Sequence, residues 1–250
     1  MKPSLTGWFS TRFRNPSARV HLYCFPYAGG GSSVFSKWPD GLGPEVEVRP
    51  VLLPGRESRI SEPAYASMDE LLPRLLNGLA PQLETPFVLF GHSMGALVAF
   101  ELACGLLRAG LPAPSRLFLS AAGPRRGPHL TDKSRLRDPE LLESLRRMNG
   151  TPPEFFDDPD LVELLLPIIR ADFTLAETFQ VATDVVLPVP ITGLAGSVDP
   201  EARPADVGTW RAHTTRDFRL EVLPGDHFFI HDQRRVLDVL ARDLGSPASG

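Results

Sequence analysis

The chain passes from one kind of secondary structure to another within the stretch FVLFGHSMG at residues 87–95. The first four residues of this stretch are apolar, branched or aromatic, and they follow a proline, which indicates a short buried strand. Residues 96–109 are rich in Ala and Leu and stop at a glycine, which indicates a helix. Gly-x-Ser-x-Gly lies between the two. In that position it predicts a sharp turn that presents Ser93 as a nucleophile.

The bare Gly-x-Ser-x-Gly pattern is weak evidence, because its three fixed positions match by chance in roughly one chain of this length in twelve. Its place between a strand and a helix favours a functional Ser93 over a coincidental glycine-rich turn. A serine hydroxyl is a poor nucleophile at neutral pH. It needs a base, a carboxylate that orients the base, and donors for the oxyanion, all of which the rest of the chain must supply.

Strands alternate with helices along most of the chain. Outside the central stretch, the apolar pattern predicts strands at residues 19–25, 46–53, 116–121, 189–195 and 218–223, and helices at 68–83 and 233–244. This order is typical of the α/β class, with a mainly parallel sheet and helices on both faces. Catalytic groups in such sheets gather at the carboxyl ends of the strands.

The pattern changes between residues 127 and 183, where no convincing strand is found. Three helix-like stretches are predicted there: 138–148, one that opens at Asp158 and is ended or kinked by Pro167, and one near 171–183. A helical block inserted between strands is where a lid over an active site would lie, the alternative being an ordinary surface elaboration. We therefore expect one domain over residues 1–250, with a helical lid insertion at about 127–183.

Composition excludes several classes of protein. The chain has a net charge of -4, whereas a nucleic-acid binder typically carries an excess of basic residues. No apolar run approaches 18 residues and no signal core is seen, so we expect a soluble, cytoplasmic protein with no membrane contact. Cys24 and Cys104 lie in a predicted strand and a predicted helix, and we expect buried thiols rather than a disulfide framework. His231 follows His227 by four residues but lacks the Glu and third ligand of a metal motif, so no metal or cofactor is expected.

Three residues follow predicted strands in the chain order Ser, Asp, His that is typical of α/β-hydrolases: Ser93, Asp199 and His227. His227 would take the proton of the serine hydroxyl, and Asp199 would fix the tautomer of the imidazole and stabilise the imidazolium. His92 lies inside the sharp turn and is expected to point away from Ser93. Asp226 is adjacent to His227, and their side chains would diverge. Asp199 is therefore the preferred acid, with a structural turn-former as the alternative.

A glycine-rich loop, PYAGGGS at residues 26–32, follows the first predicted strand. It lacks the Gly-Lys-Ser/Thr ending of a phosphate-binding P-loop, and no acidic residue follows at the spacing of a dinucleotide site. Its backbone N–H groups could instead face the nucleophile and complete an oxyanion hole, which is the interpretation we favour.

Five motifs together resemble the type II thioesterases, the free-standing enzymes that accompany modular polyketide synthases and nonribosomal peptide synthetases. They are FPYAGG at 25–30, LPGRE at 53–57, GHSMG at 91–95, LPIIRADF at 166–173 and GDHFF at 225–229, and they span nearly the whole chain. The loop AAGPR at 121–125 departs from the family's pattern, which leaves the floor of the pocket open. By this resemblance the fold would be that of an α/β-hydrolase, with Ser93, His227 and Asp199 as the triad and the amides of Met94 and Ala28 as oxyanion donors.

The resemblance implies hydrolysis of acyl groups from the phosphopantetheine arm of an acyl carrier protein or peptidyl carrier protein, by a monomer, to clear aberrant or stalled chains. One alternative is a chain-terminating medium-chain fatty acyl thioesterase or a small-molecule esterase. A non-catalytic binding protein is disfavoured because every part of the site is present. Arginines near the lid could attract an acidic carrier protein, or could form a merely solvated face. They are Arg125, Arg126, Arg135, Arg137, Arg146 and Arg147.

Overall fold

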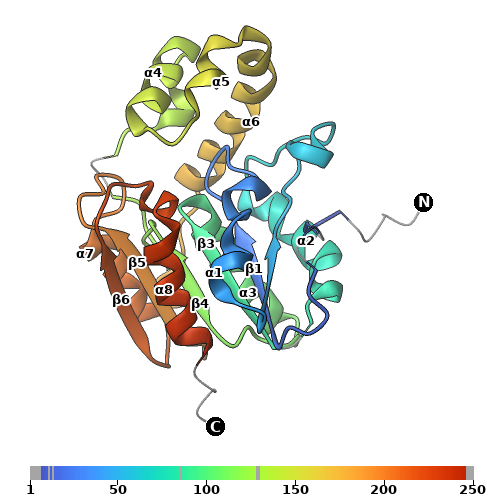
Figure 1. The fold of residues 1–250 in the computed structure, drawn as a ribbon. Helices are drawn as coiled ribbons and strands as arrows, with labels where there is room; N and C mark the ends of the chain where they lie inside the picture. The colour runs from blue at the N-terminus through green and yellow to red at the C-terminus, as the bar shows by residue number, and fades with distance from the viewer. Residues whose placement is uncertain (1–6, 11, 13, 85, 128–129, 246–250) are drawn as a thin grey trace.

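A six-stranded sheet forms the middle of the computed structural model, which describes residues 7–10, 12, 14–84, 86–127 and 130–245 (Figure 1). The strands lie in the order β2-β1-β3-β4-β5-β6, and every neighbouring pair is parallel. Their bounds are β1 Val20–Phe25, β2 Val46–Pro50, β3 Phe87–His92, β4 Leu117–Ser120, β5 Ile191–Gly196 and β6 Phe218–Leu223. The expected α/β class is confirmed, and the carboxyl ends of all these strands meet at one edge.

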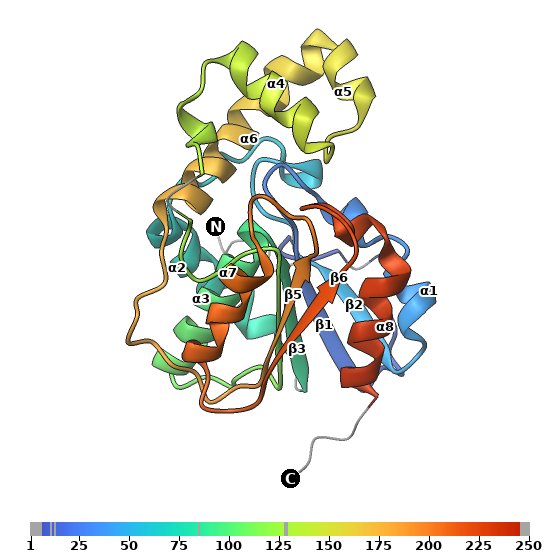
Figure 2. The same ribbon diagram turned by 90° about the vertical axis from the view of Figure 1, so that its left-hand side faces the viewer.

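Helices cover both faces of the sheet (Figure 2). One face carries α1 (Trp38–Leu42) and α8 (Gln233–Leu244), and the other carries α2 (Met68–Gly78), α3 (Met94–Arg108) and α7 (Pro204–Gly208). Successive strand residues point to opposite faces, so the apolar runs feed two separate cores. Both faces of strands β1 to β5 are therefore buried, as their near-continuous apolar sequences predict, whereas the edge strand β6 is partly exposed.

Element boundaries differ from the sequence prediction at several places. Helix α3 begins at Met94, directly after the serine, two residues earlier than expected. Strand β2 ends at Pro50, after which Val51 forms only a single antiparallel bridge with Phe9. Helix α7 and the 3-10 turn Thr209–His213 follow β5 and were not predicted. These short elements carry too few residues to show a helical period in the sequence.

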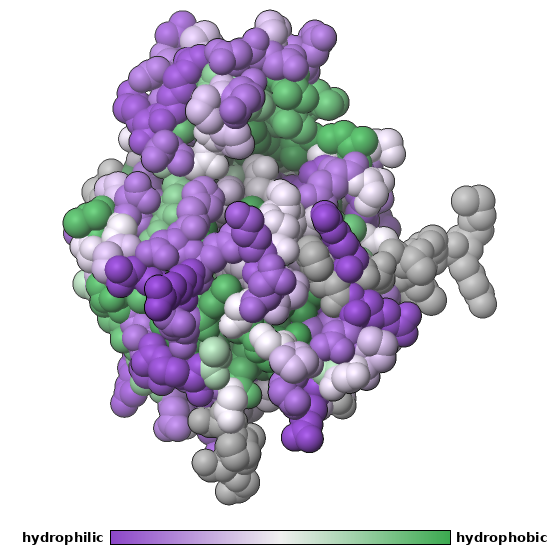
Figure 3. Space-filling model, in the orientation of Figure 1, coloured by the Kyte–Doolittle hydropathy of each residue, from purple (hydrophilic) through white to green (hydrophobic). Residues whose placement is uncertain are grey.

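A block of three helices lies over the carboxyl edge of the sheet (Figures 1 and 2). It contains α4 (Asp138–Met148), α5 (Pro153–Asp157) and α6 (Pro159–Thr178). We call these three helices the helical block. They share a small apolar core of their own, made of Leu141, Leu145, Phe155, Leu166, Ile169 and Phe173. Figure 3 shows that most of the visible outer surface of the block is hydrophilic, with apolar side chains gathered on one side.

The sequence prediction of two separate helices in the second half of the block is wrong. Helix α6 is continuous through Pro167 and ends at Thr178, whereas a helix ended or kinked at the proline and a further helix near 171–183 were expected. A proline in a helix interior removes one hydrogen bond and costs about 3 kcal/mol. Arg170, beyond the proline, donates to the carbonyl oxygens of Ser134 and Leu136 at 2.5 and 2.6 Å. Such tertiary contacts offset the local cost.

Within the ranges that the structure describes, no helix is both long and apolar enough to cross a membrane. Cys24 and Cys104 are buried and do not form a disulfide with each other. Burial raises the pKa of both thiols, that of Cys104 to about 12. Both cysteines therefore act as small apolar core residues, as the sequence predicts.

Candidate active site

The turn between β3 and α3 holds Ser93 in a strained backbone conformation, with φ of 55° and ψ of -119°. Its N–H donates to the carbonyl oxygen of Ser120 at 2.7 Å. Both glycines of the motif are sterically required. A Cβ at Gly91 would lie 2.0 Å from the carbonyl oxygen of Gly95, and a Cβ at Gly95 would lie 2.2 Å from that of Phe25. The chain can make this turn only where those two residues lack side chains.

The structure brings the three residues expected to form a triad together. His227 Nε2 lies 2.9 Å from Ser93 Oγ, and His227 Nδ1 lies 2.9 Å from Asp199 Oδ2. The second oxygen of Asp199 accepts the backbone N–H groups of Glu201 and Ala202, at 2.8 and 3.1 Å. Asp199 and His227 are 3% and 7% exposed, so their contact is shielded from water. This geometry allows an imidazole to accept a serine proton while a carboxylate orients it.

His92 is fully buried behind this arrangement. Its Nε2 lies 2.8 Å from the carbonyl oxygen of His227, and its Nδ1 lies 2.9 Å from Ser120 Oγ. Because a carbonyl only accepts, Nε2 carries the proton and Nδ1 accepts from the hydroxyl. Desolvation, with the nearby charge of His227 as a smaller cause, lowers the pKa of His92 well below its usual value. His92 is thus neutral and holds the backbone of His227.

Sequence reasoning expected His92 to point away from Ser93 but missed this supporting contact. The signal that could have found it is a polar, ionisable side chain inside an otherwise apolar strand, since such a side chain needs a partner when it is buried.

Two backbone N–H groups flank the serine. Tyr27 and Gly30 close a β-turn through a 2.8 Å hydrogen bond, and Gly29 has the positive φ, 76°, of a type II turn. In the described part of the chain no hydrogen bond is found from the N–H of Ala28. Met94 is the first residue of α3, where N–H groups have no intrahelical acceptor and the helix dipole is positive. An anionic oxygen could be accepted here.

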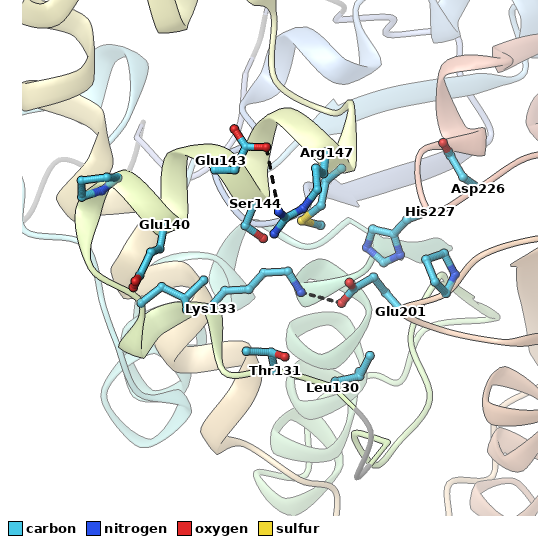
Figure 4. Close-up of a pocket in the computed structure, with 14 residues that line it drawn as sticks. Leu130, Thr131, Lys133, Glu140, Glu143, Ser144, Arg147, Glu201, Asp226 and His227 are labelled. Carbon is cyan, nitrogen blue, oxygen red and sulfur yellow. Dashed lines mark hydrogen bonds and ion pairs between the residues drawn. The ribbon is translucent and has the colours of Figure 1, made fainter.

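Ser93 lies between two large clefts under the helical block. The first cleft has a volume of about 780 Å³ and separates α4 from the loops that carry the acid and the base. Figure 4 shows Glu140, Glu143 and Arg147 on one side of it and Glu201 and His227 on the other. The other, of about 610 Å³, lies between the block and the glycine-rich loop. A smaller cavity of about 30 Å³ lies between them and is lined by Ala28, Ser93, Met148 and His227. A linear substrate could therefore reach the serine from either side.

The loop that departs from the family's pattern lines a further cavity of about 100 Å³ beside Ser93. Residues 121–127 contribute to it together with Met94, Phe173 and Phe179. Ala121 has a positive φ of 53°, so this loop leaves β4 in a constrained conformation. The cavity is narrow, and its lining combines these apolar side chains with charged ones such as Lys133 and Glu177.

An ion pair joins the insertion to the loop of the acid. Lys133 Nζ lies 2.6 Å from Glu201 Oε2, and the lysine side chain is 9% exposed (Figure 4). Glu201 is also the residue whose N–H binds Asp199. Sequence reasoning did not identify Lys133, because nothing near it in the chain signals a partner 68 positions away.

The arginines near the lid are mostly paired with acids of the same segment. Five of the six have carboxylates within 4.0 Å: Arg126 and Arg135 with Asp132, Arg137 with Glu140, and Arg146 and Arg147 with Glu143. Arg125 is exposed. Residues 125–147 still contain seven Lys or Arg and four Asp or Glu, so an excess of positive charge remains.

Nowhere in the described ranges do three or more His, Cys, Asp or Glu side chains form a group that could hold a metal ion. His231 instead lies 3.2 Å from the hydroxyl of Tyr27 through its Nε2. Its contact is with the turn that carries Ala28, which is a structural use of this side chain.

A parallel sheet with helices on both faces, a sharp serine turn after a central strand, and an acid and a histidine after later strands define an α/β-hydrolase fold. A family model described as "Thioesterase domain" matches residues 20–244. The chain therefore belongs to the thioesterase family, and it is a hydrolase that acts on thioesters.

Individual proteins agree with this family. The solved structure of BorB, a type II thioesterase from the borrelidin biosynthetic cluster, is similar with a TM-score of 0.84 and 35% identity, covering 95% of this chain and 97% of that one. The medium-chain S-acyl fatty acid synthase thioesterase of Homo sapiens is 35% identical over 90% of this chain and 86% of its own. LgrE of Brevibacillus parabrevis, named linear gramicidin dehydrogenase, is 38% identical over 97% of this chain and 94% of its own. The resemblance to type II thioesterases is confirmed.

Proposed function

We propose that the chain removes acyl groups from the phosphopantetheine arm of an acyl or peptidyl carrier protein, clearing aberrant or stalled chains in polyketide or nonribosomal peptide biosynthesis. Ser93 is the nucleophile, His227 the base and Asp199 the orienting acid. The observation that carries this proposal is the unbroken pair of 2.9 Å contacts from Ser93 through His227 to Asp199, next to two amides. The similarity to BorB, a type II thioesterase, supports the choice of substrate class.

The reaction follows from these groups in order. Ser93 attacks the thioester carbonyl carbon while His227 takes the hydroxyl proton, and the N–H groups of Ala28 and Met94 stabilise the oxyanion. The carbon–sulfur bond then breaks. A thiol with a pKa of about 8.5 leaves as the thiolate with little need of prior protonation, unlike an alcohol. The thiolate then takes up the proton held by His227, which restores the neutral imidazole. Water activated by His227 next attacks the acyl-serine and releases the free acid.

The helical block acts in this proposal as the lid of a single domain that comprises residues 1–250. The clefts on its two sides have separate uses, because a thioester has an acyl side and a pantetheine side that must both be accommodated when its carbonyl is at Ser93. The ion pair of Lys133 with Glu201 supports a closed position of the insertion beside the acid loop. The excess positive charge of residues 125–147 suits an acidic carrier protein. Monomeric state and cytoplasmic location stay predictions.

The second candidate is a chain-terminating medium-chain fatty acyl thioesterase, favoured by the relation to the human protein of that name. It uses the same chemistry and differs in acyl length. LgrE is named a dehydrogenase, but we do not propose oxidoreduction for this chain. Its glycine-rich loop is not followed by an acidic residue at the spacing of a dinucleotide site.

The test measures hydrolysis by intact-protein mass spectrometry. Carrier proteins loaded with short, branched and long acyl groups are incubated with the wild type, with Ser93→Ala, and with Ser36→Ala as a control at an exposed serine. We expect Ser93→Ala to lose about 10³-fold or more of the rate and Ser36→Ala to match the wild type. Full hydrolysis by Ser93→Ala would refute the nucleophile. Faster turnover of free esters than of loaded carriers would refute the substrate class alone.

A further inference from the structure

A closed ring of hydrogen bonds ties the glycine-rich turn to helix α6. Asp172 on α6 accepts the backbone N–H of Gly29 at 2.7 Å with Oδ2, and the Nη2 of Arg56 at 2.7 Å with Oδ1. Arg56 completes the ring by donating from Nη1 to the carbonyl oxygen of Gly30 at 2.9 Å. The N–H of Gly29 and the carbonyl oxygen of Gly30, both in the turn that follows Ala28, are therefore held by the side chains of one ion pair.

The ion pair in this ring is dry. Asp172 is 2% exposed and Arg56 is 7% exposed. Charge-assisted hydrogen bonds in such surroundings are short and directional, and a partner that is lost cannot be replaced by water. None of the groups proposed to react is part of the ring, so the chemistry does not use this buried pair directly.

The ring selects one form of the turn. Type I and type II turns differ by a flip of their central peptide, here the one between Ala28 and Gly29. In the observed form the N–H of Gly29 points to the carboxylate of Asp172. After a flip to type I the carbonyl oxygen of Ala28 would approach this carboxylate, which is electrostatically unfavourable. The negative charge of Asp172 thus favours the type II form of this turn. The N–H of Ala28 belongs to the preceding peptide, so the ring acts on it by holding the whole turn in place against α6.

Helix α6 also contacts this turn sterically. A Cβ at Gly29 would lie 3.0 Å from Cγ1 of Ile169, so helix and turn are in close contact. Ile169 and Asp172 are three positions apart and lie on the same side of the helix. Ala28 itself packs against the apolar core of the helical block. The position of α6 and the geometry of the turn are therefore linked.

We infer that Asp172, held by Arg56, is a positioning residue that keeps the N–H of Ala28 directed at the oxyanion and makes that geometry depend on the seating of α6. The inference rests on the proposed role of Ala28 as an oxyanion donor. Removal of one oxyanion donor slows serine hydrolases by about 10² to 10³ in kcat, and misdirecting a donor costs less than removing it.

The test uses two variants of the pair. Asp172→Asn keeps the shape but removes the charge. The double variant Arg56→Met with Asp172→Leu removes both charges. Neither charge is then left buried alone, so we expect this variant to fold even where a single substitution destabilises the protein. Glu47→Gln is the matched control. Glu47 is a buried carboxylate on β2 that pairs with Arg49 at 2.6 Å, and Arg49 also donates to the hydroxyl of Tyr23, so this pair does not contact the glycine-rich turn.

For each variant we measure kcat and KM on an acyl-pantetheine thioester, and we count the active sites by titration. We also measure the affinity for butylboronic acid, because its tetrahedral adduct with Ser93 places an oxygen in the oxyanion position. For both pair variants we expect kcat per titrated site to fall about 10- to 100-fold and boronate affinity to fall in parallel. KM and the shape of the pH profile should stay as in the wild type, and Glu47→Gln should keep its kcat.

Two outcomes would overturn the inference. The first is a kcat per active site within threefold of wild type in the folded double variant. The second is a loss confined to the number of active sites, or accompanied by a changed pH profile, since either would mean a general structural role. Neither outcome touches the proposed function, which is tested separately by Ser93→Ala and by the comparison of loaded carriers with free esters.

Discussion

Lowering the pH from 7 to 5 should destabilise this fold through one buried side chain, His92. The pKa of His92 is lowered from its usual value of 6.5, chiefly by desolvation. In the unfolded chain this imidazole takes up a proton near pH 6.5, whereas in the folded protein it stays neutral. Below pH 6.5 the unfolded state therefore binds more protons, and stability falls as the pH falls.

The size of this effect follows from the contacts of His92. Protonation would place a charge in a site with no exposed surface and would remove the acceptor that Nδ1 offers to Ser120. The loss is at most about 1.4 kcal/mol for each pH unit below 6.5, which sets an upper limit of about 2 kcal/mol at pH 5. That is a large share of the total stability of a typical domain, about 5 to 15 kcal/mol.

The assay is urea unfolding of the wild type and of His92→Gln at several pH values between 5 and 7.5. Glutamine cannot titrate, and its amide can still donate to the carbonyl oxygen of His227. We expect the variant to start less stable at pH 7 but to lose less stability than the wild type on going to pH 5, by up to about 2 kcal/mol. Equal losses in the two proteins would refute the reasoning, because the proton uptake would then belong to other groups.

Two further changes test the steric requirements of the site. Gly95→Ala should prevent the serine turn from forming, because its Cβ would lie 2.2 Å from the carbonyl oxygen of Phe25. Gly208→Ala is the control and should fold normally, because its Cβ would have only an ordinary neighbour at 3.6 Å. Equal melting temperatures and active-site titres for the two variants would contradict this prediction. Met148→Ala should join the cavities on either side of Ser93 and raise the hydrolysis of long or branched acyl thioesters severalfold relative to short ones, and an unchanged rate ratio across the acyl panel would count against it.

Local patterns in the sequence were sufficient for the sheet and for the serine turn. Apolar runs of strand length, helices with start and stop signals, and paired glycines around Ser93 are all properties of a few neighbouring residues. Because catalytic groups of parallel sheets gather at the carboxyl ends of the strands, the sequence also pointed to Asp199 and His227 without knowledge of any distance. The structure places both within hydrogen-bond contact of their expected neighbours, and their catalytic roles stay predictions until the variants are made.

Only the tertiary structure decided the features that depend on pairs of residues far apart in the chain. Helix α6 continues through Pro167 because residues beyond the proline bind the rest of the molecule, which no local propensity reports. Asp172 meets Gly29 across 143 positions and Arg56 across 116, and His92 meets the backbone of His227 across 135. A sequence determines which side chains are capable of such contacts. Which of them meet depends on the order of the strands and on the helical block above them, because only packing sets those distances.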